Sequence, residues 1–152
     1  MIELKPEKPE DWWEVEALFD LCFAPGREAL SSYRLRDENG ILAGAIRFWP
    51  VRVGGQPALL LGPVAVHPTH QGEGLGAVLI EGGVEAARRG GWARVMLVGD
   101  APYYSRFGFE RLDGVVMPPP TNPDRVLGQA LAEGAWDGVT GPVIKWDSPN
   151  GD

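Results

Sequence analysis

The residues best suited to chemistry lie in one glycine-rich loop, Gln71–Gly76 (QGEGLG). It stands between a continuously apolar segment, residues 58–66, and an amphipathic segment at about 74–89. Glycines allow successive backbone N–H groups to turn toward one point, and a helix N-terminus adds roughly half a positive charge there. The loop is therefore expected to bind phosphate or pyrophosphate. The alternative is a plain connection between strand and helix, which three alternating glycines make entropically costly.

Three classes of phosphate ligand compete for this loop. A Walker A loop needs Lys and Ser or Thr after its last glycine, where this sequence has Ala77. A dinucleotide fingerprint has to be forced onto Gly72, Gly74 and Ala77, with Asp100 as the ribose-binding acid. Residues 67–71 then separate strand from loop, and too little chain follows Asp100 for the remaining βαβ units. The third class is coenzyme A.

Length and composition indicate one globular domain spanning residues 1–152. Apolar residues make up 44% and charged residues 23%, as in ordinary soluble proteins. Six Trp, five Phe and three Tyr argue against disorder, so the 21 Gly and 14 Pro are attributed to tight turns.

The charge balance and the few metal-binding residues exclude several partners. With 14 basic and 21 acidic residues the net charge is −7, which disfavours nucleic acid. Cys22 is the only cysteine, so an internal disulfide is excluded; its place in an apolar stripe indicates a packing thiol. Because His67 and His70 are the only histidines and no ligand spacing is apparent, no metal site is expected. No 18-residue apolar run or secretory signal is present, and a cytoplasmic protein is expected.

Periodicity predicts a helix, two hairpins and a central strand in the first half of the chain. The helix begins at Asp11 and ends at Pro25-Gly26. Residues 32–38 and 41–49 read as strands joined by a two-residue turn at Asn39-Gly40, and Gly54-Gly55 marks a second turn. Residues 58–66 read as a strand covered on both faces, with a bulge at Gly62-Pro63.

The second half begins with a helix at about 74–89. Its expected inner face consists of Leu75, Val78, Leu79, Gly82 and Ala86, and Gly90 is its expected cap. Further expected elements are strands at 92–99, 107–112 and 142–147 and a turn or short helix at 101–106. The fold class is α/β (mixed α+β), a single domain with a central mixed, splayed β-sheet flanked by helices.

Three segments carry a resemblance to a known family. Gln71-x-x-Gly74-x-Gly76 is similar to the Q/R-x-x-G-x-G/A signature of the GNAT superfamily, the CoA-dependent N-acetyltransferases. Residues 64–68 (VAVHP) look like the family's central strand, and residues 104–109 (YSRFGF) resemble its later segment of a tyrosine, three residues and Gly-Phe. Together they resemble the YhbS-like branch of small predicted acetyltransferases. The match is strong over residues 58–112 and weak over 113–152.

The resemblance implies direct transfer of an acyl group from acetyl-CoA to an amine, with no metal. The residues whose amides are then expected to hold the pyrophosphate are Gly72, Gly74, Leu75, Gly76 and Ala77. Gln71 is expected to shape the loop, and the backbone of Val64 and Val66 is expected to pair with the pantetheine arm.

The same resemblance makes Tyr104 the acid that protonates the departing thiolate, with Tyr103 as the alternative. Leu97 replaces an asparagine that many relatives carry, which leaves that contact to CoA unsupported. No ionisable residue occurs in 58–66, where many relatives have a glutamate base. Asp100 is the nearest candidate base, with a helix cap as its alternative; His67 or a water relay are the others.

The leading hypothesis is an N-acetyltransferase acting on a small, cationic or polar amine. A non-catalytic acyl-CoA-binding or regulatory module and a scaffold without a CoA site are the alternatives. Neither nucleic acid nor a membrane is an expected partner, and a homodimer is left open. Arg27 and Glu28 lie on the segment that often forms the acceptor wall in relatives.

Overall fold

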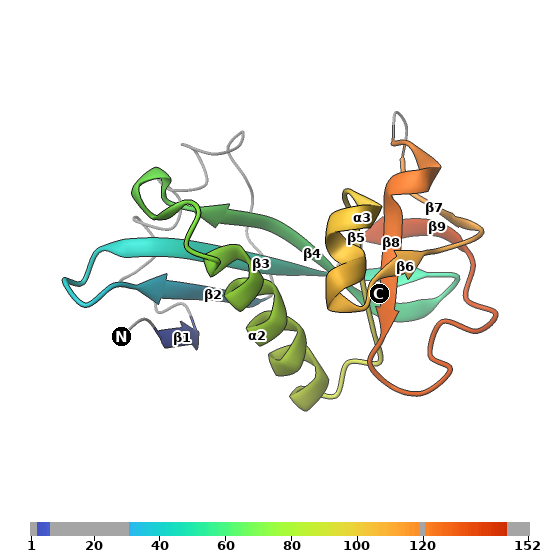
Figure 1. Ribbon diagram of the computed structural model, residues 1–152. Helices are drawn as coiled ribbons and strands as arrows, with labels where there is room; N and C mark the ends of the chain where they lie inside the picture. The colour runs from blue at the N-terminus through green and yellow to red at the C-terminus, as the bar shows by residue number, and fades with distance from the viewer. Residues whose placement is uncertain (1–2, 7–30, 119–120, 146–152) are drawn as a thin grey trace. The chain divides into compact units, whose positions relative to one another are not determined.

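The computed structural model describes residues 3–6, 31–118 and 121–145 (Figure 1). Internal contacts divide the chain into two compact units, Met1–Trp49 with Leu61–Glu85 and Pro50–Leu60 with Ala86–Asp152. Strands β3 (Leu42–Val53) and β4 (Gln56–Val66) and helix α2 (Leu75–Arg89) contribute residues to both units. Each unit is described in turn.

The first unit is built on strands paired in the order β1-β2-β3-β4. Strand β1 (Glu3–Pro6) pairs antiparallel with β2 (Ser31–Arg36), and β2 pairs antiparallel with β3. Residues 42–48 of β3 are all buried, which places this strand in the core of the unit. The predicted helix from Asp11, together with Cys22, Arg27 and Glu28, lies outside the described residues.

The predicted hairpin between β2 and β3 is confirmed, but the two-residue turn at Asn39-Gly40 is wrong. The Gly40 N–H donates to the carbonyl of Asp37 (2.9 Å), which centres the turn one residue earlier. Gly40 has φ +80°, whereas no described residue other than glycine has a positive φ. A two-residue type I′ turn would require positive φ at Asn39, so the chain forms a longer loop instead.

Helix α2 packs on the sheet of the first unit through an apolar face with one close backbone approach at Gly83 (Figure 1). A Cβ added at Gly83 would lie 2.7 Å from Cζ of Phe48, so the helix and β3 are in close contact there. The buried helix positions are Leu75, Leu79, Ile80, Gly83, Val84 and Ala87. Val78 was expected on this face but is 43% exposed. The close approach at Gly83 sets the helix rotation and turns Val78 outward.

The second unit contains two parallel strand pairs, β4 with β5 and β7 with β9, beside antiparallel ones. Its elements after α2 are β5 (Arg94–Val98), α3 (Ala101–Tyr104), the 3-10 turn η3 (Ser105–Phe107), β6 (Glu110–Arg111), β7 (Val115–Val116), η4 (Pro123–Arg125), β8 (Val126–Ala130) and β9 (Gly141–Lys145). Strand β5 pairs parallel with β4 and antiparallel with β8, which also pairs with β6. Strand β9 pairs with the end of β3 and with β7.

Some predicted boundaries in this unit need correction. The strand expected at 107–112 is only Glu110–Arg111, and the strand expected at 142–147 begins at Gly141, with residues 146–147 outside the described part. The left-handed glycine that closes α2 is Gly91 (φ +89°) rather than the expected Gly90. The Gly91 N–H donates to the Arg88 carbonyl, and the Trp92 N–H donates to the Ala87 carbonyl. This is the Schellman arrangement.

The splayed sheet predicted from the sequence is confirmed. The parallel ladder between β4 and β5 contains only the pairs Leu59–Val95 and Leu60–Met96, whereas β5 pairs with β8 along all five residues. The ladder ends just before Gly62, which has φ +132° and a cis peptide bond to Pro63. The Trp49 indole donates a hydrogen bond to the Gly62 carbonyl. The pattern of glycine and proline thus marks where β4 leaves its parallel partner.

Candidate active site

The glycine-rich loop follows β4 through one 3-10 turn, η2 (Pro68–His70). Gly72 and Gly74 adopt φ +88° and +79°, a left-handed conformation that L side chains rarely adopt. A Cβ at either position would have no neighbour within 4 Å. Backbone conformation therefore requires glycine at both places, and the space beside each is open.

Helix α2 starts at the end of this loop with the electrostatics that favour an anion. The Val78 N–H donates to the Gly74 carbonyl (3.3 Å), so the preceding N–H groups of residues 75–77 lie before the first intrahelical bond. No acidic residue lies in the first turn. Free donors and the helix dipole make this end suitable for phosphate.

The polar side chains around the loop are fixed within the first unit. His67 Nδ1 accepts from the Thr69 N–H (3.2 Å) and contacts Thr69 Oγ1 (2.9 Å), so His67 caps η2. The Gln71 amide donates to the Val66 carbonyl at 3.5 Å, a long contact that ties the loop to the end of β4. Val64 and Val66 are half-buried and alternate with Ala65, which is buried.

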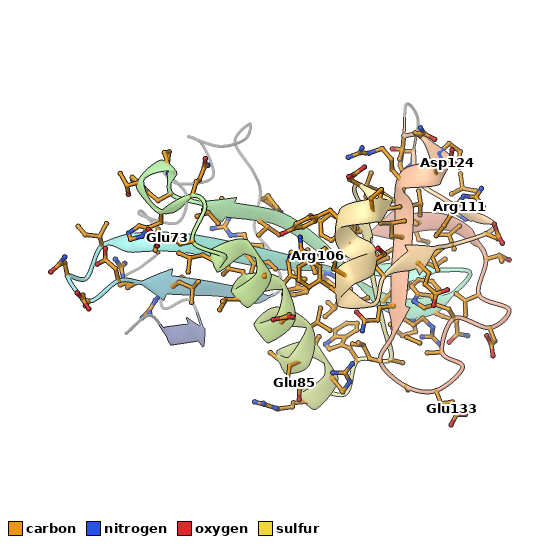
Figure 2. All side chains as sticks on the ribbon, viewed as in Figure 1. Glu73, Glu85, Arg106, Arg111, Asp124 and Glu133 are labelled. Atoms are coloured by element: carbon orange, nitrogen blue, oxygen red, sulfur yellow. The ribbon has the colours of Figure 1, made fainter. Side chains whose placement is uncertain are left out.

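A bridge centred on His70 is the main feature that sequence reasoning missed. His70 Nδ1 lies 2.9 Å from Glu73 Oε1, and Nε2 lies 3.1 Å from Asp37 Oδ2 in the β2–β3 turn. Figure 2 labels Glu73 in the loop ahead of α2. The i,i+3 spacing of His70 and Glu73 was a usable signal, but Asp37 is 33 residues away and only the fold brings it close.

The pKa values of His70 and Asp37 shift in opposite directions, each toward the charged form of its side chain. The pKa of His70 is raised above 6.5, chiefly by the hydrogen bond to Glu73, with Asp37 adding and partial desolvation opposing. The pKa of Asp37 is lowered from 3.8, chiefly by the Ile41 N–H; desolvation opposes, and Asn39 and His70 add. Between these two pKa values the bridge joins the His70 imidazolium to the Asp37 carboxylate.

In the second unit, Tyr104 ends helix α3 within a cluster of aromatic rings. Its ring centroid lies 5.0 Å from that of Tyr103 and 6.1 Å from that of Phe109. A Cβ at Gly99 would lie 2.5 Å from Tyr104 Cε2, so the ring rests directly on the Gly99 backbone. Burial raises the pKa of the Tyr104 phenol above 10.0, Tyr103 adds to this, and Arg125 partly opposes it. The phenol therefore keeps its proton at neutral pH.

Asp100 lies one turn before Tyr104, and its carbonyl accepts from the N–H groups of Tyr103 (3.1 Å) and Tyr104 (3.0 Å). Asp100 occupies the N-cap position of α3, as the alternative expected, but its side chain is exposed and makes no capping hydrogen bond. Asp100 thus lies at the surface, just after the end of β5. Leu97 is buried in β5, which explains an apolar residue there.

The predicted site residues thus fall in two groups. Val64, Val66 and the loop Gln71–Ala77 belong to the first unit, and Asp100 and Tyr104 to the second. The structure brings the loop residues together at the start of α2, and it places Asp100 beside Tyr104 through α3.

Comparison with known proteins gives the family. Residues 1–109 match the family model described as acetyltransferase (GNAT) family. The chain is also 32% identical over 121 residues to YhbS of Escherichia coli K12, an uncharacterised N-acetyltransferase, covering 70% of this chain and 72% of that protein. This chain belongs to the GNAT family of acetyltransferases. It is accordingly an acyltransferase of the N-acetyltransferase type.

Solved structures of other GNAT proteins share the fold. A crystal structure of Escherichia coli YhbS in complex with CoA matches with a TM-score of 0.87 and 27% identity, covering 98% of this chain and 92% of that one. A GNAT acetyltransferase from Brucella melitensis in complex with acetyl-CoA matches with a TM-score of 0.74 and 27% identity, covering 97% of both chains. None of the helices in the described residues is long and apolar enough to cross a membrane.

Proposed function

We propose that this GNAT enzyme transfers the acetyl group of acetyl-CoA to an amine by direct attack within a ternary complex. The observation that carries the proposal is the pair of left-handed glycines, Gly72 and Gly74, beside open space at the start of α2. The two similar structures crystallised with CoA and acetyl-CoA support the same cosubstrate. Residues 1–152 are proposed to act as a single acyltransferase domain.

The loop fits the pyrophosphate of CoA in both shape and charge. The backbone amides proposed to hold it are those of Gly72, Gly74, Leu75, Gly76 and Ala77, with Gln71 bracing the loop through Val66. The helix start carries no acidic residue that would repel phosphate. Beyond Leu60, where its ladder with β5 ends, β4 retains the backbone of Val64 and Val66 as a strand for the pantetheine arm.

In this direct transfer the protein forms no covalent bond to the acetyl group. The amine nitrogen attacks the thioester carbonyl carbon, a C–N bond forms, and the C–S bond breaks as the tetrahedral intermediate collapses. A backbone amide in residues 64–66 stabilises the negative charge that develops on the carbonyl oxygen. Tyr104 gives its proton to the departing thiolate. Its raised pKa keeps the phenol in the protonated form that this step needs, and the same shift makes it a weaker acid than an ordinary tyrosine.

The amine must also lose a proton, because an alkylammonium with a pKa near 10.4 is not a nucleophile. Asp100 is the proposed acceptor, either directly or through water, and its exposure favours a water-connected role. An acidic side chain there also suits a small, cationic or polar amine acceptor.

A non-catalytic acyl-CoA-binding module is the second candidate. Residues 58–66 of β4 contain no ionisable side chain, so the strand supplies no base. Release of free thiol from acetyl-CoA, measured with a panel of small amines, distinguishes the two candidates. A protein that binds acetyl-CoA tightly and releases no thiol with any amine would support the second.

The loop assignment is tested by Gly74→Asp, with Gly55→Asp as the matched control. Both glycines are left-handed (φ +79° and +81°) with nothing within 4 Å of a Cβ, so the backbone strain is alike. Only Gly74→Asp places a carboxylate where phosphate is proposed to bind. Calorimetry should show acetyl-CoA affinity at least about tenfold weaker for Gly74→Asp and unchanged for Gly55→Asp. Unchanged affinity in a folded Gly74→Asp protein would rule out this site.

A further inference from the structure

We propose that His70 is a positioning residue that locks the glycine-rich loop onto the β2–β3 turn, in the conformation that presents its amides to the pyrophosphate of acetyl-CoA. The inference rests on the proposed function and deepens it. His70 does not contact the reacting atoms in this proposal; it acts through Glu73 and the loop.

The geometry forms a continuous chain of contacts from the hairpin to the loop. Asp37 Oδ1 accepts from the N–H groups of Asn39 and Ile41, both at 2.9 Å, which fixes this carboxylate in the turn. Asp37 Oδ2 contacts His70 Nε2 at 3.1 Å, and His70 Nδ1 contacts Glu73 Oε1 at 2.9 Å. His70 and Asp37 side chains are only 18% and 14% exposed, so the central contact is shielded.

The loop makes few packing contacts that would fix its conformation without the bridge. Residues 71–74 are all exposed, and two of them are glycines with no packing neighbour at the Cβ position. Glycine loses more conformational freedom on ordering than any other residue. If the bridge restricts the loop before the ligand arrives, binding no longer bears that entropy cost.

The bridge also changes the charge that Glu73 presents to a bound pyrophosphate. Glu73 lies between the two left-handed glycines, where a free carboxylate would repel a pyrophosphate. Contact of both ring nitrogens with carboxylate oxygens suits the imidazolium, which donates from both. His70, which also faces Asp37, therefore offsets part of the charge on Glu73 and holds Glu73 in place. The other charged or titratable groups on these segments are Arg36, whose guanidinium donates to the Gly40 carbonyl, and Glu38 and His67.

The test compares His70→Ala with Thr69→Ala. Thr69 is the adjacent residue in η2 and its hydroxyl contacts His67, so its loss removes a side-chain contact of the same turn without touching the bridge. The acyl donors are acetyl-CoA and S-acetylpantetheine, which has no pyrophosphate. For His70→Ala, the Kd and KM for acetyl-CoA should rise about fivefold or more, with kcat within twofold. Kinetics with S-acetylpantetheine should match the parent, and Thr69→Ala should match it with both donors.

Two further variants keep the inference testable if His70→Ala folds poorly. Asp37→Asn retains Oδ1 for the turn and alters only the oxygen facing His70, so it should weaken acetyl-CoA binding in the same way. Glu73→Gln retains an acceptor for His70 and removes the carboxylate charge from the loop. This variant should therefore bind acetyl-CoA at least as tightly as the parent.

If folded His70→Ala binds acetyl-CoA as tightly as the parent, or loses activity equally with both acyl donors, the inference is overturned and the proposed function stands. A parent protein that binds no acetyl-CoA would overturn the proposed function and the inference with it.

Discussion

The contact between Gly99 and Tyr104 offers a sharp test of the proposed acid. A Cβ at Gly99 would lie 2.5 Å from Cε2 and 2.9 Å from Cδ2 of the Tyr104 ring, and 3.0 Å from Cδ1 of Leu97. Ordinary carbon–carbon contacts lie at about 3.5–4.0 Å. In Gly99→Ala the Tyr104 ring must therefore move by about 1 Å, because buried Leu97 closes the other side.

The magnitude follows from how the ring is held. Tyr103 and Phe109 lie against the Tyr104 ring with centroids 5.0 and 6.1 Å away, which limits the directions of escape. Overpacking of this kind costs about 1–3 kcal/mol of stability. A misplacement of about 1 Å in a catalytic group costs up to about 100-fold in rate. We expect kcat to fall about 10- to 100-fold in Gly99→Ala, with acetyl-CoA affinity within threefold of the parent.

The assay is thiol release with the best amine acceptor, alongside calorimetric binding of acetyl-CoA and chemical unfolding. Gly90→Ala is the control, because its Cβ meets its nearest neighbours at 3.4 and 3.5 Å and its backbone is not left-handed. It should keep parent kcat. Combining Gly99→Ala with Tyr104→Phe should cost no more rate than Tyr104→Phe alone, because both act on the same proton transfer.

A folded Gly99→Ala protein with parent kcat, alongside a Tyr104→Phe protein with low kcat, would refute the claim that Gly99 positions the acid. An equal loss of kcat and of acetyl-CoA affinity would show that the ring serves the cofactor rather than the proton.

Three further outcomes are expected. Tyr104→Phe should lower kcat by at least about tenfold with less effect on acetyl-CoA affinity; a kcat within twofold would make Tyr104 a packing residue and direct attention to Tyr103. Asp100→Asn should shift or abolish the acid limb of the kcat/KM–pH profile, and an unchanged profile would leave Asp100 as a helix-start residue only. The raised pKa of His70 contributes stability that is fully present below pH 6.5 and is lost as the pH rises through the raised pKa. The lowered pKa of Asp37 contributes stability that is lost as the pH falls below 3.8. Chemical unfolding of the parent should show the alkaline loss, and His70→Ala should not.

Much of the candidate site could be read from local sequence. The loop needs left-handed backbone at Gly72 and Gly74, and that need is expressed in residue type because only glycine adopts it readily. The irregularity at Gly62-Pro63 was readable for a similar reason: proline cannot donate to a ladder, and glycine permits the unusual φ. Helix α2 and the segment Tyr104–Phe109 followed from periodicity and motif spacing.

Errors arose where packing or a side-chain hydrogen bond selects between locally similar options. Val78 has the right spacing for the inner face of α2, yet contact between Gly83 and Phe48 fixes a rotation that exposes it. Asn39-Gly40 favours a two-residue turn in isolation, but the Asp37 carboxylate holds the N–H groups of Asn39 and Ile41 in a longer loop. Local propensity is a weak preference, and one packing contact, or one local side-chain hydrogen bond such as those of Asp37, can overturn it at about 1 kcal/mol.

The sequence by itself determined which loop glycines are left-handed, where glycine and proline interrupt the regular pattern of β4 and which tyrosine follows at the family spacing, because each depends on residues close together in the chain. Tertiary structure alone decided that Asp37 meets His70 across 33 residues. It also set the Tyr104 ring on the Gly99 backbone and left Asp100 exposed. These last features depend on which side chains are brought within a few ångströms, and short-range hydrogen bonding and steric repulsion act only once the chain has folded.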